Sequence, residues 1–325
     1  MADEPTPAGV SRKQYMYDCF KRDVERGREE NEAIPKKAGA DPGSASSQVR
    51  VVSFNVHYFR AGFSDVNLYD SFDEVVDELR RLDADILLLQ EVPVSLLQNG
   101  AVEAQLRRHG YVHSVAAGSA DVHVLSTSSS AFPNERLHVM IASRLELRQH
   151  EVVPMLDGNA AFAEVQLPGG ASALVYSLHL SVRCDAKKRR DEVAAVIAHA
   201  RAKRAQRSDA APIVVAGDFN QPNERDYPTA EWAAIAQDLA RAKLAPTDGV
   251  MEAMRDAGWV PSFEAASAPR AMPATTAWNG AVVDYCYVDR PEAKSAVPRL
   301  AVRSSYAYYT LASDHLPLVT DFSVL

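Results

Sequence analysis

Short apolar runs alternate with amphipathic segments over most of this chain, and the runs have the length of β-strands. The segment that begins at Phe72 places Phe72, Val75, Val76, Leu79 and Leu82 on one helical face, and Ser71 with Glu74 predicts a capping box at its start. A basic helix is expected over residues 185–206. The runs that predict strands are residues 49–54, 86–89, 174–178, 213–216, 282–288 and 318–324. This alternation predicts a layered α/β protein.

The first 48 residues differ from the rest of the chain. Residues 10–33 are a polar run of mixed charge with a weak apolar stripe, and the sequence GADPGSASS that follows has the composition of a linker. The stripe consists of Tyr15, Met16, Cys19 and Phe20. We therefore expect an N-terminal extension, residues 1–48, partly helical or disordered, and one domain over residues 49–325. A solvated extension is the simpler interpretation, and a helix that docks on the domain or on a partner is the alternative.

Several of the predicted strands end in side chains that bind metals or exchange protons. These residues are Asn55, Glu91, His179, Asp218 with Asn220, and Asp314 with His315. A single polar residue at a strand end is commonly a turn or a cap. A set of this kind indicates a site, because loops at the ends of strands can hold a ligand rigidly.

Composition narrows the classes of protein. The net charge of −8 disfavours a general attraction to nucleic acid or anionic membranes, although a local basic groove is still allowed. The 3 cysteines form no C-x-x-C pair, which favours a reduced compartment over a disulfide framework. The sequence shows no signal peptide and no apolar stretch of membrane-spanning length. We expect a soluble intracellular protein, in cytoplasm or nucleus, and the sequence does not indicate its oligomeric state.

The polar strand ends belong to six short motifs whose order resembles that of the endonuclease/exonuclease/phosphatase superfamily. The motifs are SFNV at 53–56, LQEV at 89–92, SLH at 177–179, GDFN at 217–220, VDY at 283–285 and SDH at 313–315. A single such motif is a weak signal, and all of them in this order are a strong one. The resemblance covers residues 49–325. It implies a four-layer α/β sandwich with two mainly antiparallel sheets between outer helices.

The resemblance also implies a metal site that agrees with the residue types. Glu91 would be the principal ligand, with Asn55 beside it and Asp314 also in the metal shell. Carboxylate and amide oxygens suit Mg²⁺, with Mn²⁺ as a second candidate, better than they suit a soft metal. The expected cofactor is therefore Mg²⁺, and the expected activity is hydrolysis of a phosphodiester or phosphomonoester by water.

The remaining motif residues would perform the catalysis. By analogy, Asp218 orients or deprotonates the attacking water, and Asn220 holds that water or a phosphate oxygen. Because Asp218 and Asn220 are two residues apart, we expect them on one side of an extended chain, with Gly217 permitting a tight turn. An Asx-turn that closes the strand is the alternative. His315 would bind the phosphate, with Asp284 as its carboxylate partner, and His179 would donate to a non-bridging oxygen.

Three features leave the substrate open. Ser143 and Arg144 keep only part of a glycine-bearing family motif, and Arg144 could support the site or contact phosphate. His57 and Tyr58 could face substrate, although packing on the core is the simpler interpretation. The main basic cluster, in and beside the helix at 185–206, could follow a nucleic acid backbone or be a solvated face. It comprises Arg183, Lys187, Lys188, Arg189, Arg190, Arg201, Lys203, Arg204 and Arg207. The substrate could thus be a nucleic acid, or a lipid or inositol phosphate as for sphingomyelinases and 5-phosphatases. A catalytically silent phosphate-binding relative is the further alternative.

Overall fold

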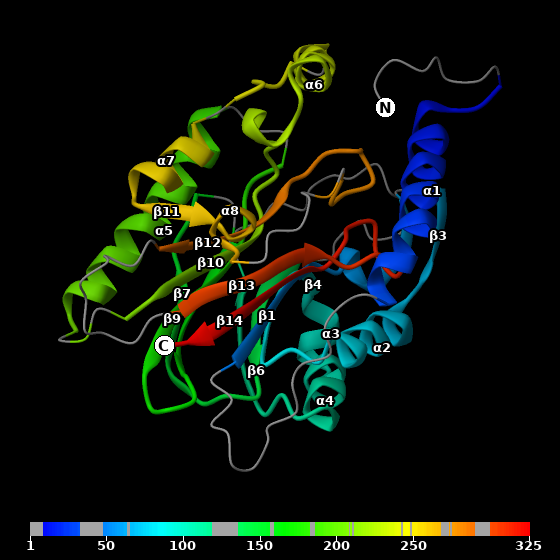
Figure 1. Cartoon of the computed structure of the whole chain (residues 1–325). Coiled ribbons are helices and arrows are strands. Elements are labelled where there is room, and N and C mark those ends of the chain that lie inside the picture. Colours follow the sequence, from blue (N-terminus) through cyan, green and yellow to red (C-terminus); the bar gives the residue numbers. More distant parts are fainter. Residues whose placement is uncertain are drawn as a thin grey trace.

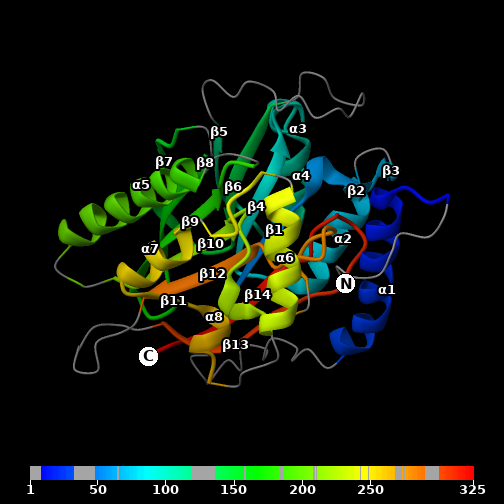
Figure 2. The ribbon, with the colours of Figure 1, turned by 90° about the horizontal axis from the view of Figure 1, so that it is seen from above.

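Two six-stranded sheets lie face to face, with helices on their outer sides (Figures 1 and 2). The computed structural model describes residues 9–32, 48–63, 66–118, 136–156, 159–182, 186–207, 209, 211–241, 243–247, 249–267, 273, 275–289 and 300–325. Both sheets are mainly antiparallel, and each contains one parallel pair near its centre.

The first sheet has the strand order β13 (Leu300–Ala307), β14 (Leu318–Val324), β1 (Gln48–Asn55), β4 (Ile86–Pro93), β6 (Leu137–Ser143) and β5 (His113–Gly118). The second has the order β11 (Trp259–Pro261), β12 (Asp284–Asp289), β10 (Ile213–Asp218), β9 (Ser172–His179), β8 (Asn159–Gln166) and β7 (Leu147–Val153). A small hairpin joins β2 (Arg60–Phe63) to β3 (Val66–Asp70). The helices are α1 (Arg12–Glu32), α2 (Phe72–Leu82), α3 (Val94–Gln98), α4 (Ala101–Arg108), α5 (Ala186–Ala205), α6 (Thr229–Arg241), α7 (Val250–Asp256) and α8 (Ser262–Ala265). Short 3₁₀ turns cover His57–Phe59 and Glu224–Asp226.

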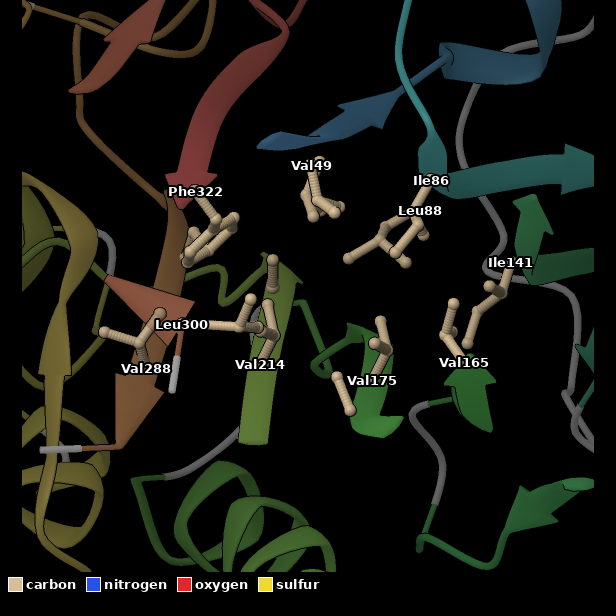
Figure 3. Close-up of a cluster of buried hydrophobic side chains, with 14 of the residues drawn as sticks. Val49, Ile86, Leu88, Ile141, Val165, Val175, Val214, Val288, Leu300 and Phe322 are labelled. Carbon is tan, nitrogen blue, oxygen red and sulfur yellow. The ribbon is translucent and has the colours of Figure 1, made fainter. Parts of the chain in front are cut away.

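Three apolar layers hold this sandwich together. In the central layer, Val49, Ile86 and Leu88 of the first sheet face Val175 and Val214 of the second (Figure 3). An outer layer packs the first sheet against α2 and α4, and another packs the second sheet against α5 and α7. Strands of both sheets are therefore buried on two faces, which explains their continuous apolar runs. The predicted four-layer α/β sandwich is confirmed.

The helix predicted after Ser71 is α2, but its start differs from the prediction. Val75, Val76, Leu79 and Leu82 are buried on one face, as their spacing indicates. No capping bond is made by Ser71, whose hydroxyl donates to Ala312 O at 2.7 Å instead. The capping box was therefore a wrong prediction, because a tertiary partner in the segment before β14 takes the hydroxyl.

Helix α1 packs on the loop that leads into β14. Its Phe20 and Val24 are buried together with Ala307 and Leu316. Asn31 brackets Tyr309 with two hydrogen bonds, donating from Nδ2 to Tyr309 O at 2.8 Å and accepting from Tyr309 N at 3.0 Å. Of the predicted apolar stripe, Cys19 and Phe20 are thus buried within the chain. How residues 33–47 connect it to β1 lies outside the described residues.

Helix α5 packs on the second sheet through Val193, Val196, Ile197 and Ala200. Many cations of the predicted basic cluster form ion pairs: Lys187 with Asp191, Lys203 with Glu151, Arg204 with Asp289, and Arg207, just after the helix, with Glu164 and Asp209. Arg183 and Cys184 lie outside the described residues, and Cys19 and Cys286 are buried free thiols. Among the helices of the described part of the chain, none combines the length and apolarity that a membrane crossing requires.

The contact between α1 and Tyr309 can be tested at Gly27. A Cβ at this position would lie 2.4 Å from ring carbons of Tyr309. Alanine normally stabilises a helix interior by about 0.5–1 kcal/mol relative to glycine. We expect Gly27→Ala to reverse this sign and to lower the free energy of unfolding by about 1–3 kcal/mol, as overpacking does. Denaturant unfolding measures the change, with Glu29→Ala on the exposed face as the control, and stabilisation by Gly27→Ala would contradict the packing.

A second prediction concerns Asp226, which follows β10 and accepts a hydrogen bond from Tyr285 Oη at 2.7 Å. Burial raises the pKa of Asp226 from 3.8 to about 6. The folded state therefore binds the carboxyl proton of Asp226 more tightly than the unfolded state does. The stabilisation that results is fully present at low pH and is lost as pH rises through about 6. We expect the stability of Asp226→Asn relative to wild type to increase between pH 4 and pH 7. Urea unfolding across this range gives the difference, and a difference that is constant or decreases with pH would refute the prediction.

Candidate active site

The parallel strand pairs bring the predicted site residues to one end of both sheets. In the first sheet, β1 ends at Asn55, which lies opposite Gln90 of β4. In the second, β10 ends at Asp218, which lies opposite His179 of β9 and Asp284 of β12. The strands thus deliver these side chains to a common edge of the sandwich from distant parts of the sequence.

Hydrogen bonds between the sheets close this edge. Asn55 Nδ2 donates to Glu91 Oε1 at 3.2 Å in its own sheet and to Asp218 Oδ2 at 3.1 Å in the other. Below them, Gln90 Nε2 donates to Ser177 Oγ at 3.1 Å. Gln90 is fully buried, and its role as a link between the sheets was not foreseen from the sequence.

Glu91 reaches the site because β4 is irregular at this point. The register of β4 with β6 shifts between Leu89 and Val92, and Glu91 has φ of +56°. A non-glycine residue in this left-handed region costs of order 1–3 kcal/mol and occurs mainly where the fold enforces it. The bulge redirects the carboxylate toward His179, whose Nε2 lies 3.7 Å from Glu91 Oε1.

Asp218 lies at the centre of the cluster. Its Oδ2 lies 3.5 Å from His179 Nε2 and 3.9 Å from His315 Nε2. Its Oδ1 accepts from Asn220 N at 2.8 Å, and Asn220 has φ of +51°. The expected extended chain from Asp218 to Asn220 is thus wrong, and the Asx-turn is observed. The amide of Asn220 donates to Leu180 O at 2.9 Å, which ties this turn to the end of β9.

Gly217 is required for a different reason from the one expected. It belongs to β10 rather than to a turn, with φ of +154°. A Cβ on this residue would lie 1.9 Å from Leu178 O of the neighbouring strand β9. The glycine allows the backbones to approach closely beside Asp218.

His315 and Asp284 form a buried pair on the other side of Asp218. His315 Nδ1 lies 2.9 Å from Asp284 Oδ2, and Asp284 N donates to Thr276 Oγ1 at 3.1 Å. Burial by itself lowers the pKa of His315, but the charge and hydrogen bond of Asp284, together with Asp218 and Asp314, raise it well above 6.5. These neighbouring charges favour the imidazolium form of the ring, and its Nε2 faces Asp218 Oδ2 at 3.9 Å.

Asp314 is held in the cluster by the Ser313 hydroxyl and by its own carbonyl. Ser313 Oγ donates to Asn55 O at 2.8 Å, and Trp278 N donates to Asp314 O at 2.8 Å. Burial raises the pKa of Asp314, the charge of His315 lowers it and the charge of Asp218 raises it, with a net value of about 7. His57 Nε2 lies 3.6 Å from Asp314 Oδ2. His57 is thus in contact with the site, a position that the sequence left open.

The residues present fit a divalent cation. Glu91 Oε2 and Asp314 Oδ1 are buried oxygens without a hydrogen-bond partner in the described part of the chain, and His179 Nε2 is likewise unpartnered there. Asp218, Asp284 and His315 offer a second grouping, with ligand atoms within 4.8 Å of one another. Because His315 Nδ1 is bonded to Asp284, the carboxylates of Glu91 and Asp314 are the better match for a cation.

Arg144 lies away from this edge. It follows β6 next to Ser143, which pairs with Ile86 at the start of β4, whereas Glu91 lies near the end of that strand. Five residues at about 3.3 Å each separate the two ends. Arg144 forms an ion pair with Asp83 and donates from Nε to His109 O at 3.1 Å. These contacts make it a structural residue rather than a phosphate ligand.

Comparison with solved structures gives the same architecture. The human Nocturnin catalytic domain with a bound sulfate anion has a TM-score of 0.63 at 17% identity, over 86% of this chain and 95% of that one. An endonuclease/exonuclease/phosphatase from Beutenbergia cavernae has a TM-score of 0.60 at 18% identity, over 85% of this chain and 72% of that one. ANGEL2, a 2′,3′-cyclic phosphatase, has a TM-score of 0.58 at 15% identity, over 85% of this chain and 95% of that one. At these identities the likeness shows the fold alone.

Comparison of the sequence gives the family. No curated protein matches this sequence. Residues 52–315 match the profile of the Endonuclease/Exonuclease/phosphatase family, a span that runs from β1 to His315 and includes every residue of the predicted site. The family comprises phosphoesterases that usually use a divalent metal. The chain therefore belongs to the Endonuclease/Exonuclease/phosphatase family.

Proposed function

We propose that this chain is a divalent-metal-dependent phosphoesterase that hydrolyses its substrate by direct attack of water. One observation carries the proposal: buried carboxylate oxygens without partners lie in the same cluster as an imidazolium–carboxylate pair. The first group suits a cation and the second suits a phosphate anion. Membership of a phosphoesterase family supports this reading of the cluster.

Glu91 and Asp314 would hold the cation, which we expect to be Mg²⁺ or Mn²⁺. When bound, such a cation neutralises charge on the phosphate oxygens and supports the departing oxygen. Asn55 orients these ligands, because its Nδ2 donates to Glu91 and Asp218 and its Oδ1 accepts from His57 N at 3.0 Å. We therefore assign Asn55 a positioning role beside the metal.

Asp218 is the proposed base. Its carboxylate is 1% exposed and is fixed on Oδ1 by Asn220 N and on Oδ2 by Asn55 Nδ2. A fixed carboxylate at the centre of the cluster can orient a water molecule and accept its proton. Asn220 would hold the same water or a phosphate oxygen.

His315 and His179 are the proposed phosphate contacts. Asp284 keeps His315 charged and in one orientation, so that the imidazolium can donate to a phosphate oxygen as negative charge develops. His179, with its free Nε2 between Glu91 and Asp218, would donate to a second oxygen.

Direct attack of water involves no covalent enzyme intermediate. Burial raises the pKa of the Cys286 thiol to about 11, which disfavours the thiolate. The cluster itself supplies carboxylates, amides and imidazoles, and these groups suit activation of water.

The proposal is tested first by metal dependence. We expect hydrolysis of a phosphate ester in Mg²⁺ or Mn²⁺ and none in EDTA, with recovery on return of the metal, because the unpartnered oxygens need a cation to bind the anionic substrate. The panel comprises a generic phosphodiester, a phosphomonoester, 2′,3′-cyclic AMP, single-stranded RNA and DNA, an inositol polyphosphate and sphingomyelin. The panel includes 2′,3′-cyclic AMP because ANGEL2 is a 2′,3′-cyclic phosphatase. Full activity in EDTA would exclude the mechanism, and no activity on any substrate would favour a silent phosphate-binding relative.

The assigned roles are separated by two variants. Asp218→Asn removes the base, and we expect kcat to fall by about 10²–10⁴-fold at every metal concentration. Glu91→Ala removes a ligand, and we expect a rightward shift of the metal titration that excess metal partly rescues. Arg144→Ala, remote from the cluster, is the control for activity. Metal rescue of Asp218→Asn, or unchanged metal dependence of Glu91→Ala, would contradict these roles.

A further inference from the structure

His57 directs the ring nitrogen Nε2 toward the site. Its Nδ1 lies 3.1 Å from Arg60 O. A carbonyl oxygen only accepts hydrogen bonds, so Nδ1 carries the proton. In the neutral ring, Nε2 then has a lone pair, and this atom lies 3.6 Å from Asp314 Oδ2. That separation exceeds the length of a hydrogen bond.

The carboxylate that faces this nitrogen is buried, and the nearby charge of His315 compensates it only in part. Asp314 is 4% exposed, and its Oδ1 has no hydrogen-bond partner in the described part of the chain. A lone pair and a buried carboxylate oxygen repel each other unless a positive group lies between them. A divalent cation between the two groups, or a proton on one of them, relieves this repulsion.

The backbone holds His57 in this orientation at a local cost. His57, Tyr58 and Phe59 have φ values of +42°, +60° and +59°. Consecutive left-handed residues other than glycine cost about 1–2 kcal/mol each. The turn is fixed by the bond from His57 N to Asn55 Oδ1 and by Phe59, which is 2% exposed in the core beneath. The fold thus enforces a ring direction that local preferences disfavour.

Asn55 connects this ring to the rest of the proposed metal site. Its side chain bonds His57 N through Oδ1 and Glu91 Oε1 through Nδ2, and its carbonyl accepts from Ser313, the neighbour of Asp314. His57, Glu91 and Asp314 are therefore all anchored to one residue. A cation held by the two carboxylates would lie within the same network as the ring.

We propose that His57 Nε2 is a ligand of the divalent cation and that it shifts the selectivity of the site from Mg²⁺ toward Mn²⁺ and Co²⁺. This inference rests on the proposed function, since it concerns the same metal site. Mg²⁺ strongly prefers oxygen ligands, whereas later divalent metals accept imidazole nitrogen with increasing affinity. The oxygens alone would suit Mg²⁺, so the imidazole is the residue that determines selectivity.

The competing arrangement is a charged His57 that forms an ion pair with Asp314. The two arrangements predict opposite effects on metal affinity when the His57 ring is removed. A nitrogen ligand adds affinity for metal, so its removal weakens binding. An imidazolium repels metal and occupies Asp314, so its removal strengthens binding.

Metal titration of the full chain measures the direction of this change in affinity. Isothermal titration with Mn²⁺ and with Mg²⁺ compares wild type, His57→Gln and the control His150→Gln, which changes an exposed residue of β7. We expect His57→Gln to lower the affinity for Mn²⁺ about tenfold or more, as loss of groups that support a metal does. The affinity for Mg²⁺ should change less, so that the Mn²⁺/Mg²⁺ ratio falls, and His150→Gln should match wild type. A higher affinity or an unchanged ratio in His57→Gln would overturn the proposal.

A spectroscopic measurement tests the nitrogen ligand directly, first in the wild-type protein. Pulsed EPR of the wild-type protein with one Mn²⁺ bound should show coupling to ¹⁴N of an imidazole. The coupling should vanish in His57→Gln and persist in His179→Gln, which removes the other free ring nitrogen of the cluster. Absence of the coupling in wild type, or its loss in His179→Gln alone, would refute ligation by His57. These outcomes leave the proposed function standing if hydrolysis still requires metal, whereas a wild type that binds no metal would refute both.

Discussion

Burial of several aspartates at the junction of the two sheets is the constraint on which the rest of this structure depends. Asp218 and Asp284 are each 1% exposed, and Asp314 is 4% exposed. An ionised carboxylate removed from water destabilises the fold by several kcal/mol unless it is paired or hydrogen bonded. The structure supplies the Asn55 amide, the Asn220 backbone N–H and the His315 ring, but part of the negative charge remains uncompensated. The same imbalance that costs stability makes the cluster suitable for a cation and an anionic substrate.

The placement of the parallel strand pairs makes this junction possible. Parallel neighbours end on the same side, so that Asn55 with Gln90, and Asp218 with His179, arrive as adjacent pairs. The face-to-face packing of the sheets then places one pair against the other, and the Asn55–Asp218 bond joins them. Antiparallel neighbours complete the site from the opposite chain direction, because β12 begins at Asp284. The apolar layer between the sheets therefore fixes the geometry of the polar edge.

Backbone conformations that local preferences disfavour are concentrated at this edge. Glu91, Asn220 and the turn at His57–Phe59 all have positive φ. Each is held by contacts from elsewhere, such as the β4 bulge or the Asx-turn on Asp218. Arg189 of α5 adds a further support, since its Nη2 donates to Gln221 at 2.9 Å beside this turn. Strained backbone conformations thus occur where they orient the side chains of the site.

The sequence by itself determined the layers and the identity of the residues at the strand ends. Continuous apolar runs are required by burial on two faces, and α2 and α5 follow from their spacing of apolar residues. Tertiary structure alone decided the orientation of these residues: the bulge at Glu91, the close approach of Gly217 to Leu178, the bond from Ser71 to Ala312 and the turn of His57 toward Asp314. Periodicity reports only which face of an element is buried. Each of these contacts depends on partners that are remote in sequence, because a side chain turns toward whichever partner the packed sheets bring within reach.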